Sequence, residues 1–141
     1  MSGVAVVRYL LANNVNVTAV VPATSIKAGE LQLNQTLPAI YISQVSSIPR
    51  LTLAMTETGR MNTDRVQVTA LIKDQQGAPQ GQGYPGLNAL MKLILAACPN
   101  QHGTINTFNV DSILPDIEGP DLYDEEISMI SRSRDFIVKW F

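Results

Sequence analysis

The chain has 141 residues, of which 45% are hydrophobic and 16% charged, and its formal net charge is −2. This length predicts one domain spanning residues 1–141. With 10 basic and 12 acidic residues the chain lacks the basic footprint that neutralises phosphates, which argues against sequence-specific nucleic-acid binding. Charged residues average about 25% of protein sequences, so this surface is poor in charge, as suits a subunit packed against copies of itself or other proteins.

Cysteine content and hydropathy indicate in which cellular compartment the protein is expected to work. Cys98 is the single cysteine, which excludes an internal disulfide and a cysteine-based zinc cluster. It lies on an apolar helix face and is expected to be a buried structural thiol rather than a nucleophile. No secretory signal is recognisable, and no segment approaches the roughly 20 apolar residues that span a bilayer. We therefore expect a protein made and used in the cytoplasm, with no membrane partner.

The N-terminal half predicts a helix followed by two paired strands. Apolar residues at helical spacing indicate a helix over Val4–Ala12, and weaker patterns indicate a helical turn at Val17–Val21 and a short strand at Ser25–Ala28. β-Branched and aromatic residues indicate a strand over Leu37–Val45. Apolar and polar residues alternate over Arg65–Lys73, which predicts a strand with one apolar side. We expect these two strands to be antiparallel neighbours.

The C-terminal half predicts a buried helix and two further strands. The helix is expected from Pro85 to Cys98, and a strand over Thr104–Ile113. The segment Leu114–Glu126 holds half of the acidic residues and is expected to be a solvated loop. Ile127–Phe141 is expected to be the last strand, with an end too apolar to be loose. Together these elements predict the α+β class, with a mostly antiparallel central sheet of about four strands and two main helices packed on one face.

The connection Ser46–Thr63 is long for a sheet of this size. Leu51, Leu53 and Met55 alternate with Thr52, Ala54 and Thr56, which indicates strands that extend beyond the sheet. Connections of this length are uncommon without a purpose. We interpret residues 46–63 as a protruding β-hairpin arm that docks on a neighbouring subunit, and an inert surface loop is the alternative.

The candidate subunit or tube contacts are the exposed arm residues and the aromatic end of the chain. They are Ile48, Arg50, Leu51, Leu53, Met55, Arg60, Met61, Trp140 and Phe141.

Recognisable catalytic and ligand-binding motifs are absent from the sequence. The Gly-rich run from Asp74 to Gly86 has neither a GxxxxGK[ST] pattern nor a basic residue, which argues against a phosphate loop. The acidic segment lacks the calcium-loop spacing. His102 is the only histidine and lies in a Gln-His-Gly turn with no nucleophile motif around it. We therefore expect no enzyme, no cofactor and no metal site.

The order of these elements resembles the tail-completion proteins of long-tailed phages, which include tail terminators and head–tail joining proteins. The likeness covers essentially the whole chain and is carried by VRYLLANN, VNVTAVVP, LPAIYISQVS, RVQVTALIKD, GLNALMKLILAA and EGPDLYDEEISMISRSRDFIVKWF. The last stretch is the most similar, with an acidic segment and then an Arg-x-x-Asp-Phe-x-Val-x-Trp strand. The chain departs from the family pattern in the long, charge-poor Ser46–Thr63 insert and in the Gly-rich crossover.

This resemblance implies a structural virion protein of the tail or neck, assembled in the host cytoplasm. It implies a homo-oligomeric ring, commonly a hexamer, that terminates the tail tube and joins it to the head connector or stopper protein, with genomic DNA passing through the lumen. On this interpretation the acidic segment faces the lumen and repels DNA so that it slides. The lumen candidates are Asp116, Glu118, Asp121 and Asp124.

Two other functions stay open at the level of sequence. The first is a head-closure (stopper) or tube-building subunit of the same particle. The second is of another class, a small ligand-binding α+β module, which predicts a monomer or dimer with a pocket.

Overall fold

The computed structural model describes residues 2–29, 37–50, 61–73, 83–126 and 128–141. The α-helices are α1 (Ser2–Ala12), α2 (Val15–Thr18) and α3 (Gly83–Ala97), and a short 3-10 helix, η1, spans Ala23–Ser25. The strands are β1 (Ile26–Ala28), β2 (Ala39–Arg50), β3 (Met61–Lys73), β4 (Gly103–Ile105), β5 (Phe108–Glu118), β6 (Leu122–Asp124) and β7 (Met129–Trp140).

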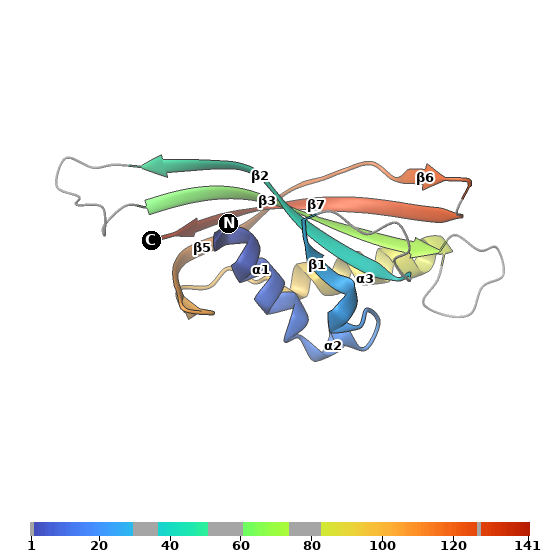
Figure 1. Ribbon diagram of the computed structural model, residues 1–141, viewed down its shortest axis with the longest axis horizontal. Helices are drawn as coiled ribbons and strands as arrows, with labels where there is room; N and C mark the ends of the chain where they lie inside the picture. The colour runs from blue at the N-terminus through green and yellow to red at the C-terminus, as the bar shows by residue number, and fades with distance from the viewer. Residues whose placement is uncertain (1, 30–36, 51–60, 74–82, 127) are drawn as a thin grey trace.

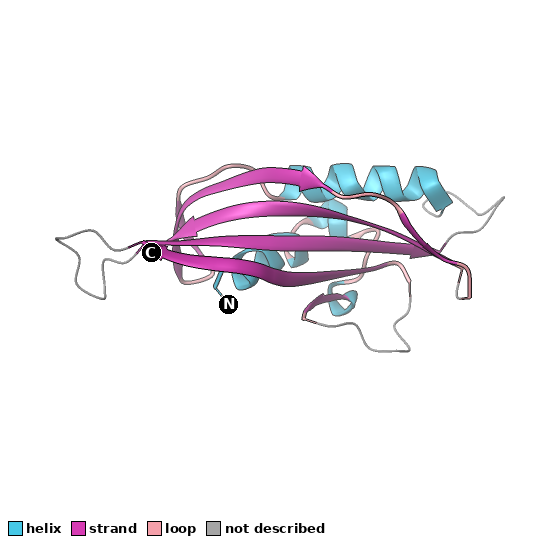
Figure 2. Cartoon of the chain, turned by 90° about the horizontal axis from the view of Figure 1, so that it is seen from above, coloured by secondary structure: helices cyan, strands magenta, loops and turns pink. Residues whose placement is uncertain are grey.

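All seven strands belong to one curled sheet with the order β1-β2-β3-β7-β5-β4, in which β6 continues beside β7. The β1–β2 pair is parallel and the other pairs are antiparallel. The helices lie on one side of the sheet, and the long strands cross over them (Figures 1 and 2). The expected sheet of about four strands with two main helices is therefore wrong, because the fold is a mixed seven-stranded half-barrel with three α-helices. The short strand indicated at Ser25–Ala28 corresponds to β1. The strands that were not predicted separately, β4 and β6, have three residues each, too few for an alternating pattern to be recognised.

The predicted strand Thr104–Ile113 and the predicted acidic loop also need correction. A turn at Asn106 and Thr107, with φ angles of 47° and 70°, separates β4 from β5. Beyond this turn β5 runs on to Glu118, and β6 follows, so most of the acidic segment is strand. Pro115 and Pro120 suggested a loop. Pro120 does lie in the connection between β5 and β6, but Pro115 lies within β5, where proline is tolerated because the strand has a free edge.

The long strands agree with the alternation in the sequence. The apolar side of β3 is fully buried, and its neighbours on β2 and β7 continue the same layer. Residues of this layer with no exposed surface include Ile40, Ile42, Val66, Val68, Ala70, Ile72, Ile130, Phe136 and Val138. The buried faces of α1 and α3 cover it, and each fully buried aliphatic side chain contributes about 1.5–3 kcal/mol.

Leu71 was the one apolar residue on the polar side of the predicted strand. It is 5% exposed, although no helix covers that face. Leu71, Pro120 and Leu122 line the same hollow, so the segment between β5 and β6 folds back over this part of the sheet. The helix-free face is thus partly covered by the chain itself.

Candidate functional site

Strands β2 and β3 project beyond the helices at one end of the molecule (Figure 1). Their described ladder ends with Arg50 opposite Met61, two of the predicted contact residues. Ile48, a third, is 58% exposed in this extension. The predicted residues Leu51, Leu53, Met55 and Arg60 lie outside the described residues, so the outer part of the arm stays a prediction.

The base of this extension is held by a buried carboxylate. Asp64 has no exposed surface, and its Oδ2 accepts hydrogen bonds from Gly3 N at 3.0 Å and from Trp140 Nε1 at 2.8 Å. Its Oδ1 accepts from the hydroxyl of Ser47 on β2. One side chain therefore joins β2, β3, the first turn of α1 and the last residue of β7. The negative charge at the start of α1 also complements the helix dipole.

The aromatic end of the chain is part of the same junction. The ring of Trp140 packs edge-on against Phe108 with centroids 5.9 Å apart, and Phe141 N donates to Asn109 O at 2.9 Å. Trp140 is half-buried, whereas Phe141 is 45% exposed. The two predicted terminal contacts thus differ, since Trp140 is bonded within the fold and Phe141 is available at the surface.

The projecting half of the sheet has two outer edges that no described strand pairs. On β2, partner β1 extends only to Ile42, so Ser43–Arg50 is open. On β5, partner β4 extends only to Val110, so no described strand pairs the outer edge of Asp111–Glu118. Within this segment Ile113 N–H donates to Asn100 Oδ1, and Asp116 O accepts from Arg134 Nη1. Unpaired edges are templates for pairing with another chain.

These two edges lie at the same level across the sheet. Ser46 pairs with Arg65, Arg65 pairs with Ile137, and Ile137 pairs with Leu114. One row of paired residues, which we call a rung, therefore runs from the open edge of β2 to the open edge of β5. Both edges carry exposed apolar side chains, namely Val45, Ile48, Leu114 and Ile117.

The acidic residues predicted to face a lumen are largely paired with arginine. The guanidinium of Arg65 bridges Asp116 and Asp135, the latter at 3.1 Å. Arg134 Nη2 lies 2.8 Å from Glu118 Oε2. These bonds to Asp116 and Asp135 raise the pKa of Arg65 above its ordinary value. The segment is therefore part of an ion-pair network across β3, β7 and β5.

Arg132 anchors the start of β6 to the start of α3. Its Nε donates to Asp121 Oδ1 at 2.6 Å, its Nη1 donates to Asn88 Oδ1 at 2.7 Å, and its guanidinium lies 5.3 Å from the Tyr84 ring centroid. The hydrogen bond from Arg132 holds the pKa of Asp121 below its ordinary value, and the same bond raises the pKa of Arg132. Asp124, by contrast, makes no ion pair with any described residue.

The sequence did not reveal these arginine partners or Asp64. Arg65 precedes the apolar alternation of β3, and Arg132 and Arg134 share a strand face with Ile130 and Phe136. Their carboxylate partners lie 11 to 70 residues away. Asp64 lies within the polar stretch Asn62–Arg65, which gave no sign of its burial. The lumen assignment of Asp116, Glu118, Asp121 and Asp124 stays a prediction, now with only Asp124 free of an arginine partner within the described chain.

Groups suited to chemistry are few among the described residues. They include no set of three His, Cys, Asp or Glu side chains that could hold a metal ion. His102 Nδ1 lies 3.7 Å from Asp111 Oδ1 at an exposed position. Burial raises the pKa of the Cys98 thiol to about 12, so almost none of it is thiolate at neutral pH. Over the same residues no helix is both long and apolar enough to cross a membrane.

Comparison with known proteins gives a likeness of fold without a family. No protein-family model and no curated protein matches the sequence. Among solved structures 28 chains match. One belongs to a structure titled "Virion of native gene transfer agent (GTA) particle", with a TM-score of 0.64 and 13% sequence identity over 99% of this chain and 96% of that one. This likeness shows that the two chains share a fold from end to end.

Proposed function

We propose that this chain is a structural subunit of a phage-like virion, and specifically that it forms the ring that terminates the tail tube and joins it to the head. The observation that carries the proposal is the end-to-end likeness to a chain of a gene transfer agent virion. The order of elements and the C-terminal sequence pattern support the finer role, through their resemblance to tail-completion proteins. A hexamer, with DNA passing through its lumen, is what that resemblance implies.

The two open edges support ring formation. The edges of β2 and β5 share rungs, so β5 of one copy can extend the sheet at β2 of the next without a shift along the strands. Such strand addition supplies backbone hydrogen bonds, and the exposed apolar residues supply specificity. The contact joins two different surfaces, so a suitable rotation between copies closes a ring.

The extended β2–β3 pair supports contact beyond the ring plane. It projects past the helices, and its base is fixed by Asp64 on three other elements. We propose that residues 46–63 reach the last ring of the tail tube protein or the neighbouring subunit, while the opposite side of the ring meets the head connector or stopper. Ile48, Arg50, Met61 and Phe141 are the contact residues proposed within the described chain.

A stopper or tube-building subunit is the second candidate, because a virion likeness alone supports all three positions. Electron micrographs of particles assembled without this protein distinguish a terminator, a stopper and a tube subunit. A terminator predicts headless tails of uncontrolled length, whereas a stopper predicts normal tails beside heads that leak DNA. A tube subunit predicts no tails at all.

The arm is tested by replacing residues 51–60 with Asn-Gly. Arg50 and Met61 are directly paired, so a two-residue turn can join them without loss of any described strand pair. This is a cleaner change than deletion of Ile48–Asn62, which also removes Asn62, the β3 partner of Trp140 on β7. We expect a subunit with unchanged unfolding temperature that assembles into particles at least about tenfold less efficiently. Normal rings and infectious particles from this variant would refute the arm hypothesis.

A further inference from the structure

The surface that remains unexplained is β6, a strand whose three side chains are all exposed. Leu122 and Tyr123 are 63% and 59% exposed, which is unusual for apolar residues in a short strand. The next residues, Asp124, Glu125 and Glu126, make no ion pair with any described residue. β6 pairs with β7 through its backbone, but its exposed side chains and the acidic residues that follow form an apolar and acidic knob that no ion pair ties to the rest of the described chain.

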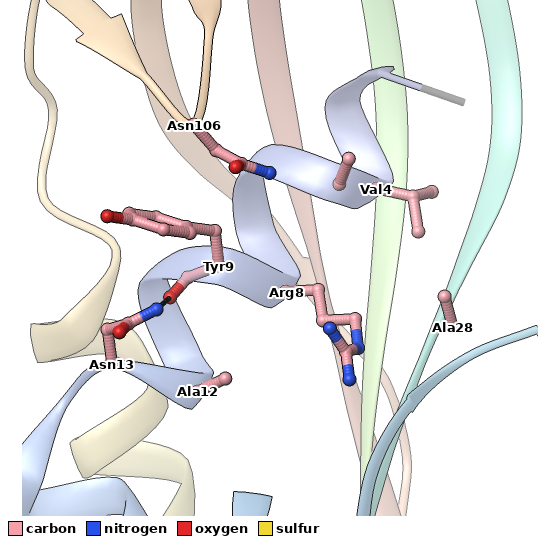
Figure 3. Close-up of a pocket in the computed structure, with 8 residues that line it drawn as sticks. Val4, Arg8, Tyr9, Ala12, Asn13, Ala28 and Asn106 are labelled. Carbon is pink, nitrogen blue, oxygen red and sulfur yellow. Dashed lines mark hydrogen bonds between the residues drawn. The ribbon is translucent and has the colours of Figure 1, made fainter.

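A complementary surface lies at the opposite edge of the sheet, around β1. Arg8 on α1 donates from Nε to Ile26 O at 3.2 Å, and it lines a hollow of about 340 Å³ together with Val4, Ala5 and Ala28 (Figure 3). Lys27 pairs with Tyr41 in β2, so its side chain lies on the other, helix-free face. Neither Arg8 nor Lys27 forms an ion pair within the described chain. Two free cations therefore flank β1, one on each face of the sheet.

The rungs place these two surfaces one after the other along the strand direction. Strand β1 spans the rungs of Val68 to Ala70 on β3. On the far edge, β5 ends on the rung of Val68 and β6 begins on the rung of Leu71. When β5 of one copy extends β2 of the next, β1 of the second copy falls in line with the gap between β5 and β6. It then shares only the rung of Val68 with β5, and β6 occupies the three rungs that follow β1.

The side-chain directions also agree. Asp124 pairs with Met129 and therefore lies on the helix-free face, the same face as Lys27. Tyr123 pairs with Ile130 and lies on the helix side, the same side as Arg8. An aromatic ring beside a guanidinium is a favourable contact, as is a carboxylate beside an ammonium group.

From these observations we infer that the β6 knob, residues 122–126, docks on the Arg8–Lys27 surface of a second copy of this chain. This inference rests on the proposed ring and names the contact that sets its register. Opposite charges at the two ends of one subunit favour head-to-tail pairing and disfavour head-to-head pairing.

Charge reversal with rescue tests the inference on the full chain, at a concentration where the wild type forms rings in the electron microscope. One variant carries Arg8→Glu and Lys27→Glu, and the other carries Asp124→Lys, Glu125→Lys and Glu126→Lys. Within each variant, the knob and the surface on which it would dock carry charges of the same sign. We therefore expect self-association of each variant to weaken at least about tenfold. The mixture has opposite charges at every contact and should restore rings of alternating copies. Lys92→Glu, at an exposed position on α3, is the matched control and should assemble normally.

Cross-linking provides an independent readout. A chain with both Lys27→Cys and Asp124→Cys, treated with a short bis-maleimide, should give a ladder beyond the dimer, because each copy carries both halves of the contact. Cys98 is 1% exposed and its thiol is scarcely ionised, so it should not react. The control pair Lys92→Cys and Asp124→Cys should give no ladder.

Normal rings from both charge variants, without a cross-linked ladder from the Lys27→Cys and Asp124→Cys chain, would overturn this inference and leave the proposed ring intact. A wild type that never forms rings, even with tail tubes, would contradict the proposed function as well.

Discussion

Loss of the Asp64 carboxylate should be among the most damaging single changes in the chain. In Asp64→Ala, the hydroxyl of Ser47 is exposed and can turn to water, but Gly3 N–H and Trp140 Nε1–H lose their acceptor in a buried place. Each unsatisfied buried donor costs about 1–3 kcal/mol, and relief from burying an unpaired charge offsets part of the total. We expect a loss of about 3 kcal/mol in the free energy of unfolding.

Asp64→Asn is the matched control, because the amide keeps the shape of the side chain. Its oxygen can accept from both Gly3 and Trp140 while its NH2 donates to the Ser47 hydroxyl. The hydrogen bonds lose only the contribution of the negative charge, so we expect the free energy of unfolding to fall by about 1 kcal/mol. Urea unfolding followed by far-UV circular dichroism measures both variants. A double-mutant cycle of Asp64→Ala with Trp140→Phe should give a coupling of about 1 kcal/mol. If Asp64→Ala lies within about 0.5 kcal/mol of the wild type, the carboxylate does not hold the base of the arm.

Three further predictions concern the same junction and the arginine network. Gly3→Ala should lower the free energy of unfolding by about 1–3 kcal/mol, because the new Cβ would lie 2.8 Å from Asp64 Cβ. This loss should exceed the gain from the better helix propensity of alanine. A urea midpoint at or above that of the wild type would contradict this prediction. Removal of Trp140–Phe141 should lower the unfolding temperature, since it deletes the bond to Asp64 and the packing on Phe108, and an unchanged thermal transition would refute it. Since the folded pKa of Asp121 is lowered, its pairing with Arg132 stabilises the fold above the ordinary pKa of about 4 and is lost as the pH falls through the lower folded value. Asp121→Asn should therefore have a lower urea midpoint than the wild type at pH 6 and converge with it in acid, and parallel curves would be inconsistent with the pair.

Regular alternation and helical spacing predicted the long elements because they report burial locally. Arg65–Lys73 and the helix from Pro85 to Cys98 fall within one residue or a few of β3 and α3. The break at Asn106 was not predicted, although asparagine tolerates positive φ, because apolar residues continue on both sides of the turn.

The partners within the candidate site could not be predicted from the sequence. The bond from Gly3 to Asp64 joins residues 61 positions apart, and the bond from Trp140 to Asp64 joins residues 76 apart. Neither propensity nor periodicity carries information on such pairs. The acidic segment looked like a loop for the same reason, since its stability as strand depends on arginines of β3 and β7.

Localisation of the chain in the intact particle by electron cryomicroscopy is the decisive test of the proposed ring. We expect a single ring at the head-proximal end of the tail tube, with β2 of each copy beside β5 of the next and the β2–β3 extension reaching the tube or the neighbouring subunit. Density for this chain within the head, in repeated rings along the tube, or as an isolated copy would contradict it.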